Sequence, residues 1–104
     1  MTETFDRTRL IKRTITTSAG DTLRDFMENN NISQKELAFR LGVSQPHISD
    51  IINRRKFMSN ELAIKLEMVT GLQAEFMLRR DFSYKLAQMN HLREEIEPLE
   101  RVYG

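Results

Sequence analysis

The strongest constraint on the fold is a pair of helix signals that follow each other without a linker, in the stretch "ISQKELAFRLGVSQPHISDIIN". Ser33 is placed to cap the first helix, and Glu36, three residues later, is placed to close a capping box. Gly42 can take the left-handed conformation that ends a helix. Ser44 is placed to cap the next helix immediately afterwards. The sequence therefore predicts two short helices joined by a tight turn, which is the arrangement of a helix-turn-helix.

Further helix signals surround this pair. The spacing of caps and apolar residues predicts helices from Ser18 to the "ENNN" run, from Ser59 to Gly71, and from Leu72 past residue 90. No segment gives a convincing sheet. We therefore expect an all-α fold of five helices.

The 104 residues fit one domain with additions at both ends. Residues 18–90 are expected to form the helical domain. Residues 1–17 are expected to be an N-terminal arm, although "IKRTIT" alternates well enough for a short strand. Residues 91–104 are expected to form a C-terminal helical extension with an acidic tail.

Composition excludes several classes of protein. The chain has no cysteine, which excludes disulfides, thiolate metal sites and a cysteine nucleophile. His47 and His91 lack metal-ligand spacing, so we expect no metal and no cofactor. The sequence also lacks a cluster of carboxylates at metal-binding spacing, which argues against an enzyme. No stretch approaches the about 20 apolar residues of a membrane span, and "MTETFDRTRL" lacks the apolar core of a signal peptide. We expect a cytoplasmic protein.

The net charge of +1 conceals an uneven distribution. Residues 1–58 contain ten Lys and Arg against seven Asp and Glu, whereas residues 59–104 contain six against eight. Such segregation suggests two faces with different partners.

The second helix of the central pair has an apolar side, formed by isoleucines, and a polar side. An α-helix fits the major groove of B-DNA, and the N-terminal residues of a recognition helix meet the base edges. Gln45 can pair with N6 and N7 of adenine. Pro46 can contact a thymine methyl group, and His47 or Ser49 can bond to a base or a phosphate. The polar side therefore has the residue types that base recognition needs.

Positive charge follows this helix. Arg54, Arg55 and Lys56 can neutralise backbone phosphates, which adds affinity without sequence information. Asp50 would repel phosphate unless it accepts from a cytosine amino group or fixes a neighbouring arginine. Any helical bundle can carry such residues on an exposed face, and each one taken singly fits that interpretation. The combination of two capped helices, this turn and this polar face favours DNA binding.

Residues 32–71 resemble the Cro/C1-type (lambda repressor-like) helix-turn-helix family, with its spacing intact. The resemblance implies that Gln34 contacts phosphate and braces Gln45. The family commonly has a glycine where Arg54 stands. Base contacts are implied at Gln45, Pro46 and Asp50, and backbone contacts at residues 53–56. The full set of candidate DNA-binding residues is Gln34, Ser44, Gln45, Pro46, His47, Ser49, Asp50, Asn53, Arg54, Arg55 and Lys56.

The last predicted helix is longer than a small DNA-binding bundle needs. Its apolar residues, from Leu78 to Leu99, step by three or four and form one stripe. The first part of the stripe can complete the core, whereas little chain remains to cover the part from Met89 onward. We expect a protein–protein surface there, the alternative being a helix end folded over its own bundle. The interface candidates are Leu86, Met89, Leu92, Ile96 and Leu99.

This segment, read with "AGDTL" at 19–23, resembles the HigA-type antitoxins of bacterial toxin–antitoxin pairs. Those often have glycine-glutamate-x-leucine in the first helix and an "EFWL…YDL"-like run after the fourth. Here Asp21 replaces the glutamate, Met77 the tryptophan and Lys85 the aspartate. The resemblance implies a homodimer that binds an inverted-repeat operator, represses its own operon and neutralises a RelE-like (HigB-like) mRNA endonuclease. The candidate interface would then serve the dimer or the toxin.

Two other functions compete with the antitoxin. One is a stand-alone repressor of phage or chromosomal origin without a toxin partner, and the adjacent gene would separate the two. The other is an enzyme, such as a small nuclease, which the residue inventory disfavours. A pure scaffold would not need the polar face of the second helix.

Overall fold

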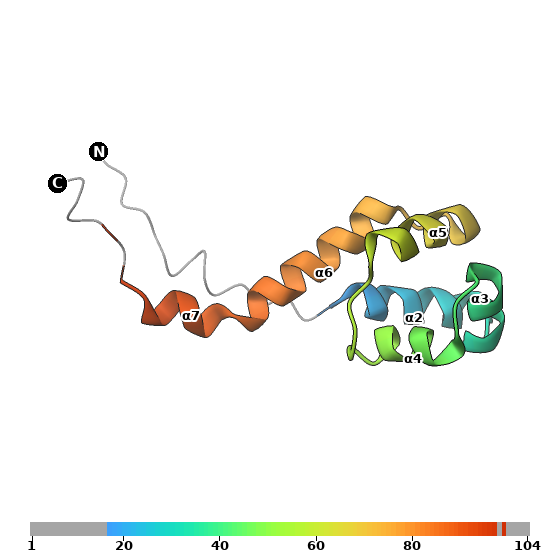
Figure 1. Cartoon of the computed structure of the whole chain (residues 1–104), viewed down its shortest axis with the longest axis horizontal. Coiled ribbons are helices and arrows are strands. Elements are labelled where there is room, and N and C mark those ends of the chain that lie inside the picture. The colour runs from blue at the N-terminus through green and yellow to red at the C-terminus, as the bar shows by residue number, and fades with distance from the viewer. Residues whose placement is uncertain (1–16, 98, 100–104) are drawn as a thin grey trace.

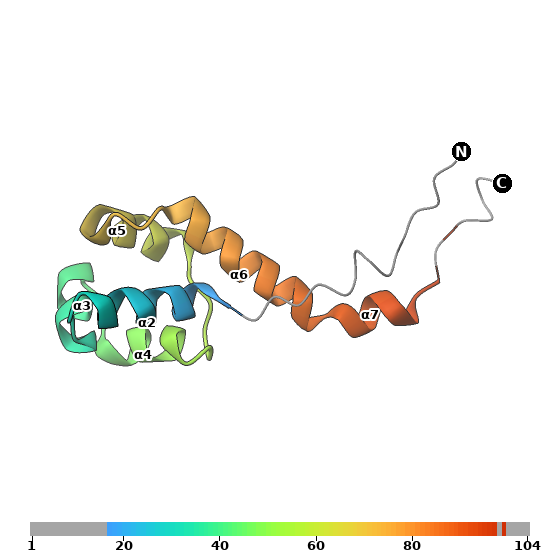
Figure 2. The ribbon, with the colours of Figure 1, turned by 180° about the vertical axis from the view of Figure 1, so that it is seen from behind.

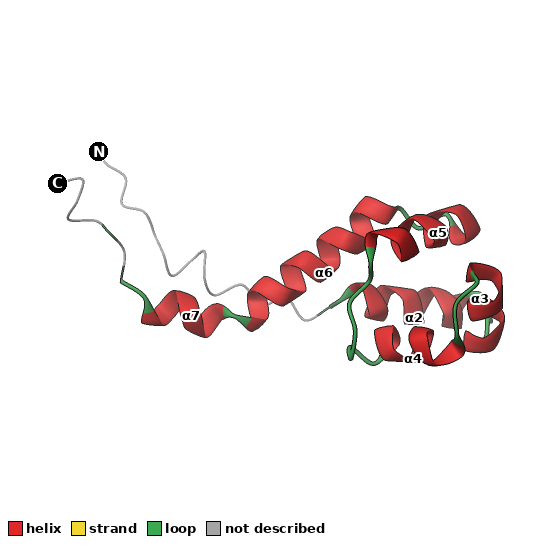
Figure 3. Cartoon of the chain, viewed as in Figure 1, coloured by secondary structure: helices red, strands yellow, loops and turns green. Residues whose placement is uncertain are grey.

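In the computed structural model, which describes residues 17–97 and 99, every regular element is a helix (Figure 3). The helices are α2 (Ala19–Asn29), α3 (Gln34–Leu41), α4 (Gln45–Ile52), α5 (Asn60–Thr70), α6 (Ala74–Gln88) and α7 (Asn90–Glu95). The predicted all-α fold is confirmed. The expected arm lies outside the described residues except for Thr17, and so does most of the tail after Glu97.

Serine caps determine where four of the helices begin. The hydroxyls of Ser18, Ser33, Ser44 and Ser59 each accept a hydrogen bond from the backbone N–H three residues later. Before α2 the capping box is complete, since the Ser18 N–H also donates to Asp21 Oδ2 over 2.9 Å. The box predicted at Ser33 is wrong in its second half. Glu36 instead accepts from Arg40 Nε and Nη2, one turn further along α3.

Glycine permits two different features of the bundle. Gly42 ends α3 with a φ of +71°, as predicted, which allows Ser44, two residues later, to cap α4. Gly20 has another role, because a Cβ atom there would overlap the carbonyl oxygen of Ile51. The absence of a side chain therefore lets α2 and α4 approach closely.

The core lies between α2, α3 and α4 on one side and α5 with the start of α6 on the other (Figures 1 and 2). Each helix contributes apolar residues at helical spacing. The largest fully buried apolar side chains are Leu23, Leu37, Ile48, Ile51, Leu66 and Met77. In the described part of the chain, no helix combines the length and the apolar character needed to cross a membrane.

The C-terminal segment leaves the bundle, and α6 points away from it with α7 further out (Figures 1 and 2). The single long helix expected after Leu72 is divided at Met89 into α6 and α7. The face of α6 that packs on the core contains Ala74, Met77 and Asp81, with Leu78 partly buried. The stripe therefore contributes little to the core beyond Leu78, since Phe82 is 62% exposed. The periodicity predicted a continuous apolar stripe, but it did not predict which face of α6 packs on the bundle.

Candidate nucleic-acid interface

Helix α4 is oriented by its isoleucines. Ile48, Ile51 and Ile52 are buried against the core. Their burial turns the opposite side of the helix outward, where Gln45 and Pro46 are exposed and His47 is half-buried. Pro46 lies in the first turn, as predicted, where a missing N–H leaves no helical bond unmade. The N-terminal end of α4 is thus a rigid, polar and accessible surface.

Hydrogen bonds fix the C-terminal end of the same helix. Asn53 caps α4, and its side-chain amide donates to the Ser49 carbonyl over 2.9 Å and to the Ser49 hydroxyl over 3.2 Å. Both residues were predicted to contact DNA. In the structure they contact each other.

Asp50 fixes a neighbouring arginine, which was one of its predicted alternatives. Its Oδ1 accepts from Arg55 Nε over 2.9 Å, and its Oδ2 lies 3.7 Å from Lys56 Nζ. The hydrogen bond from Arg55 is the main cause that lowers the pKa of Asp50, and the charge of Lys56 adds to it. The carboxylate is therefore ionised at neutral pH and gathers both basic side chains beside the exposed face of α4.

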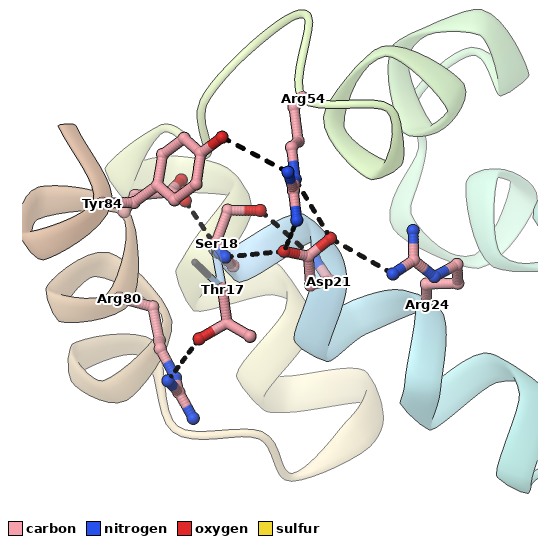
Figure 4. Close-up of polar contacts among 9 residues, drawn as sticks. Thr17, Ser18, Asp21, Arg24, Arg54, Arg80 and Tyr84 are labelled. Carbon is pink, nitrogen blue, oxygen red and sulfur yellow. Dashed lines mark hydrogen bonds and ion pairs between the residues drawn. The ribbon is translucent and has the colours of Figure 1, made fainter. Parts of the chain in front are cut away.

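Arg54 has a different set of partners. Its φ of +63° lies in the left-handed region, which is the backbone conformation that glycine accepts most readily. A residue with a side chain pays about 1–2 kcal/mol for that conformation. The Arg54 side chain turns toward α2, where Nη2 donates to Asp21 Oδ2 over 2.7 Å and Nε donates to Oδ1 over 3.3 Å (Figure 4). It also donates to the Tyr84 hydroxyl over 3.4 Å.

The electrostatics of this pair favour both charged forms. Burial raises the pKa of Asp21, but hydrogen bonds from Arg54 and the Ser18 N–H, with the charges of Arg54 and Arg24, outweigh it. The pKa of Asp21 therefore lies below its ordinary value. The hydrogen bond from Asp21 raises the pKa of Arg54. The pair is an ion pair throughout the physiological range of pH.

Helix α6 supports the loop that follows α4. Asp81 is buried, and its Oδ2 accepts from the Met58 N–H over 2.7 Å while its Oδ1 accepts from the Ala19 N–H over 2.8 Å. The Phe57 ring lies 6.1 Å from the Tyr84 ring, and Lys85 Nζ lies 4.7 Å from the Phe57 centroid. The loop after α4, residues 53–59, is called the basic loop. One face of α6 therefore contacts both the start of α2 and the end of the basic loop.

Most of the predicted DNA-binding residues lie on α4 and the following loop, whereas Gln34 is the first residue of α3. Gln34 begins α3 and lines a cavity of about 440 Å³ together with Ile32 and Ile52. Among the described residues no hydrogen bond joins Gln34 to Gln45. The phosphate and bracing roles of Gln34 stay predictions, as do the DNA contacts of the other residues.

Sequence reasoning missed Asp81 and Tyr84. A signal for Asp81 was present, because it continues the helical spacing of the buried Ala74 and Met77. A charged residue at a core position usually has buried partners. No local pattern could have paired Tyr84 with Arg54, which lies 30 residues earlier.

The candidate interface residues lie in the last turn of α6 or beyond it. Leu86, Met89, Leu92, Ile96 and Leu99 are exposed in the single chain. Leu86 lies on α6, Met89 between the two helices and Leu92 on α7. Within the described part of the chain, this end of the stripe is therefore not buried. A partner for it stays a prediction.

Comparison with known proteins supports a relationship at the level of both sequence and fold. The helix-turn-helix family model matches residues 23–76. Antitoxin HigA of Pseudomonas aeruginosa, in a structure with the higBA promoter, is 31% identical with a TM-score of 0.71, over 80% of this chain and 97% of that one. A Pseudomonas aeruginosa protein in complex with its operator DNA is 31% identical with a TM-score of 0.69, over 79% and 95%.

A relative with a different name also matches. Virulence-associated protein A of Dichelobacter nodosus is 29% identical over 76 residues, which are 71% of this chain and 74% of that protein. The region that the family model matches runs from α2 into the start of α6. It therefore includes the candidate DNA-binding residues on α4.

Proposed function

The chain belongs to the Cro/C1-type helix-turn-helix family, in the group of the HigA antitoxins, and from that premise we propose that it is a DNA-binding antitoxin that represses its own operon. The observation that carries the proposal is the exposed polar end of α4, held by three buried isoleucines and followed by Arg55 and Lys56. This arrangement can present side chains to base edges and cations to the phosphates on either side. The related proteins whose structures contain promoter or operator DNA support it.

Gln45 and Pro46 are the proposed base contacts, since they are the exposed residues of the first turn of α4. Arg55 and Lys56 are the proposed phosphate contacts. The remaining predicted residues are Gln34 on α3, with Ser44, His47, Ser49, Asp50, Asn53 and Arg54 on or beside α4. Their contribution to DNA binding is part of the same proposal.

A homodimer is the proposed binding unit. One helix-turn-helix offers a small polar contact with few cations, which is too little for tight operator binding. Two copies place two α4 helices in successive major grooves, so the operator should be an inverted repeat with half-sites roughly 10 base pairs apart. The exposed stripe from Leu86 to Leu99 supports self-association, because an apolar surface of this kind favours a partner.

The proposed second partner is a RelE/HigB-like mRNA endonuclease, which the antitoxin would neutralise by direct binding in the bacterial cytoplasm. The family relationship supports this partner, and the exposed stripe offers a surface for it. The alternative is a stand-alone repressor of phage or chromosomal type. Co-expression with the product of the neighbouring gene separates the two, since only an antitoxin co-purifies with a small endonuclease.

DNA recognition is tested by two substitutions that should impair binding in different ways. Gln45→Ala should lose preference for the operator, by about 1–3 kcal/mol if Gln45 pairs with adenine. Arg55→Ala should weaken binding to operator and unrelated DNA alike and lower the salt slope by about one. Electrophoretic mobility shift or fluorescence anisotropy titrations over a range of salt concentrations measure both effects.

Gln73→Ala is the matched control, because Gln73 precedes α6 and makes no side-chain cap bond. It should bind as the unaltered protein does. Operator binding by Gln45→Ala equal to that of the control would show that α4 is not the recognition helix. Failure of the unaltered protein to bind the promoter of its own gene would overturn the proposed function itself.

A further inference from the structure

We infer that Asp21, Arg54 and Tyr84 act together as positioning residues that hold the basic loop against the protein, so that Arg55 and Lys56, rather than Arg54, contact the DNA backbone. This inference rests on the proposed DNA binding and adds to it. It assigns Arg54, which the family pattern places beside the DNA, to an inward role. It also assigns Tyr84, on α6, to the DNA-binding function.

The side chain of Arg54 supports the inward role. Its guanidinium makes two hydrogen bonds to the carboxylate of Asp21, which is itself nearly inaccessible to solvent, with a side chain 5% exposed. Such a forked, charge-assisted pair is directional as well as strong. Asp21 is in turn fixed by the Ser18 N–H at the start of α2. The pair therefore ties the loop to the capped start of α2.

The ring of Tyr84 provides a second support from α6. The Arg54 guanidinium carbon lies 5.3 Å from the ring centroid, within the range of a cation–π contact, and the hydroxyl accepts from Nη1 over 3.4 Å. The same ring lies against Phe57 at the other end of the loop. Figure 4 shows Arg54 between Tyr84, which comes from α6, and Asp21, which comes from α2.

The backbone of the loop explains why it needs such support. Arg54 has a left-handed φ, a strained conformation for a residue with a side chain, which persists only where the surroundings determine it. On the outer side of the loop, Arg55 and Lys56 are exposed and directed to Asp50 on α4. Loss of the inner contacts would leave these two cations on a mobile loop. Each binding event would then have to order it.

Arg54→Lys is the decisive variant. A lysine supplies the same charge to a phosphate, but its ammonium group cannot make the forked contact with Asp21. If Arg54 is a positioning residue, Arg54→Lys should weaken operator binding about tenfold and leave the salt slope unchanged. Arg54→Gly removes the same contacts but also the backbone strain, because glycine accepts this conformation, so it should weaken binding less than Arg54→Lys and leave the salt slope unchanged. Tyr84→Phe, which keeps the ring, should weaken binding about two- to threefold.

Two controls complete the experiment. Arg55→Ala should lower the salt slope by about one, as expected for a true phosphate contact. Arg79→Ala removes one positive charge from the exposed surface of α6 and should change neither quantity. Circular dichroism at the binding temperature confirms that each variant is folded, and Tyr84→Phe tests the inference even if the Arg54 variants are not.

The outcomes separate the inference from the proposed function. Operator binding by Arg54→Lys equal to that of the unaltered protein, or a slope lowered by one in Arg54→Gly, would show that Arg54 contacts phosphate and would overturn the inference. Unchanged binding by Tyr84→Phe would remove the Tyr84 hydroxyl from the positioning role. In each case binding by the unaltered protein and a lowered slope in Arg55→Ala leave the proposed function standing.

Discussion

Helix α6 lies in two environments along its length, and the difference between them divides the molecule. Up to Asp81 it packs on the bundle, and Ala74, Met77 and Asp81 are buried. From Phe82 to Glu97 every described residue is exposed or half-buried, although apolar residues continue at the same spacing. The bundle should therefore carry the stability of the chain. The projecting segment, residues 82–97, should carry association, and substitutions in the two parts should affect different measurements.

The largest loss of stability is expected from Gly20→Ala, in the bundle. A methyl group there would overlap the Ile51 carbonyl oxygen, so the backbones of α2 and α4 must move apart. Displacements of this kind cost about 3 kcal/mol. Urea unfolding measures the loss. Gly42→Asn is the control, because a Cβ atom there meets open space and asparagine tolerates a left-handed φ. Equal stability of Gly20→Ala and the unaltered protein would contradict the close contact of these helices.

Asp81→Ala should have the next largest effect, at the boundary between the two regions. It leaves the N–H groups of Ala19 and Met58 without their acceptor in a buried position. An unsatisfied buried group costs about 1–3 kcal/mol, so at the low end of that range for each N–H we expect a loss of about 2 kcal/mol for the two together. Asp25→Ala removes the same side chain from an exposed position on α2 and should change stability little. Comparable losses in the two variants would show that Asp81 does not join α6 to the bundle.

The smallest effect on stability is expected from Leu92→Ser combined with Ile96→Ser, in the projecting segment. Both residues are exposed in the single chain, so the change in unfolding free energy should stay within about 0.5 kcal/mol per site. Self-association, measured by sedimentation, or capture of the toxin should weaken instead. Met68→Ser, at an exposed apolar position on α5, is the control. Loss of self-association in Met68→Ser alone would place the interface on α5.

Local patterns predicted most of the bundle. The serine caps, the left-handed Gly42 and the inward isoleucines of α4 depend on neighbours in the sequence, and each was visible there. The contacts of Asp81 with Ala19 span 62 residues, and those of Arg54 with Asp21 span 33, so no local pattern contains them.

The division of the last helix had a similar cause. Apolar periodicity from Leu78 to Leu99 is continuous. The pattern does not show where contact with the bundle ends, and so it does not show that one continuous helix gives way to two. At Met89 the backbone departs from helical geometry, with ψ of 23°, beyond the last contact with the core. Glu36 shows the same limit on a smaller scale, because two local partners were available and Arg40 was the one bound.

The ion pairs of Asp50 make DNA binding an exchange reaction. In the proposed complex a phosphate competes for Arg55 and Lys56 with a carboxylate that the protein itself supplies. On unrelated DNA the displaced carboxylate faces a negatively charged groove without compensation. At a site that presents a cytosine amino group it regains a hydrogen bond. The exchange therefore lowers the affinity for the many unrelated sites of a chromosome more than the affinity for the operator. A larger share of the protein then stays available to bind its operator.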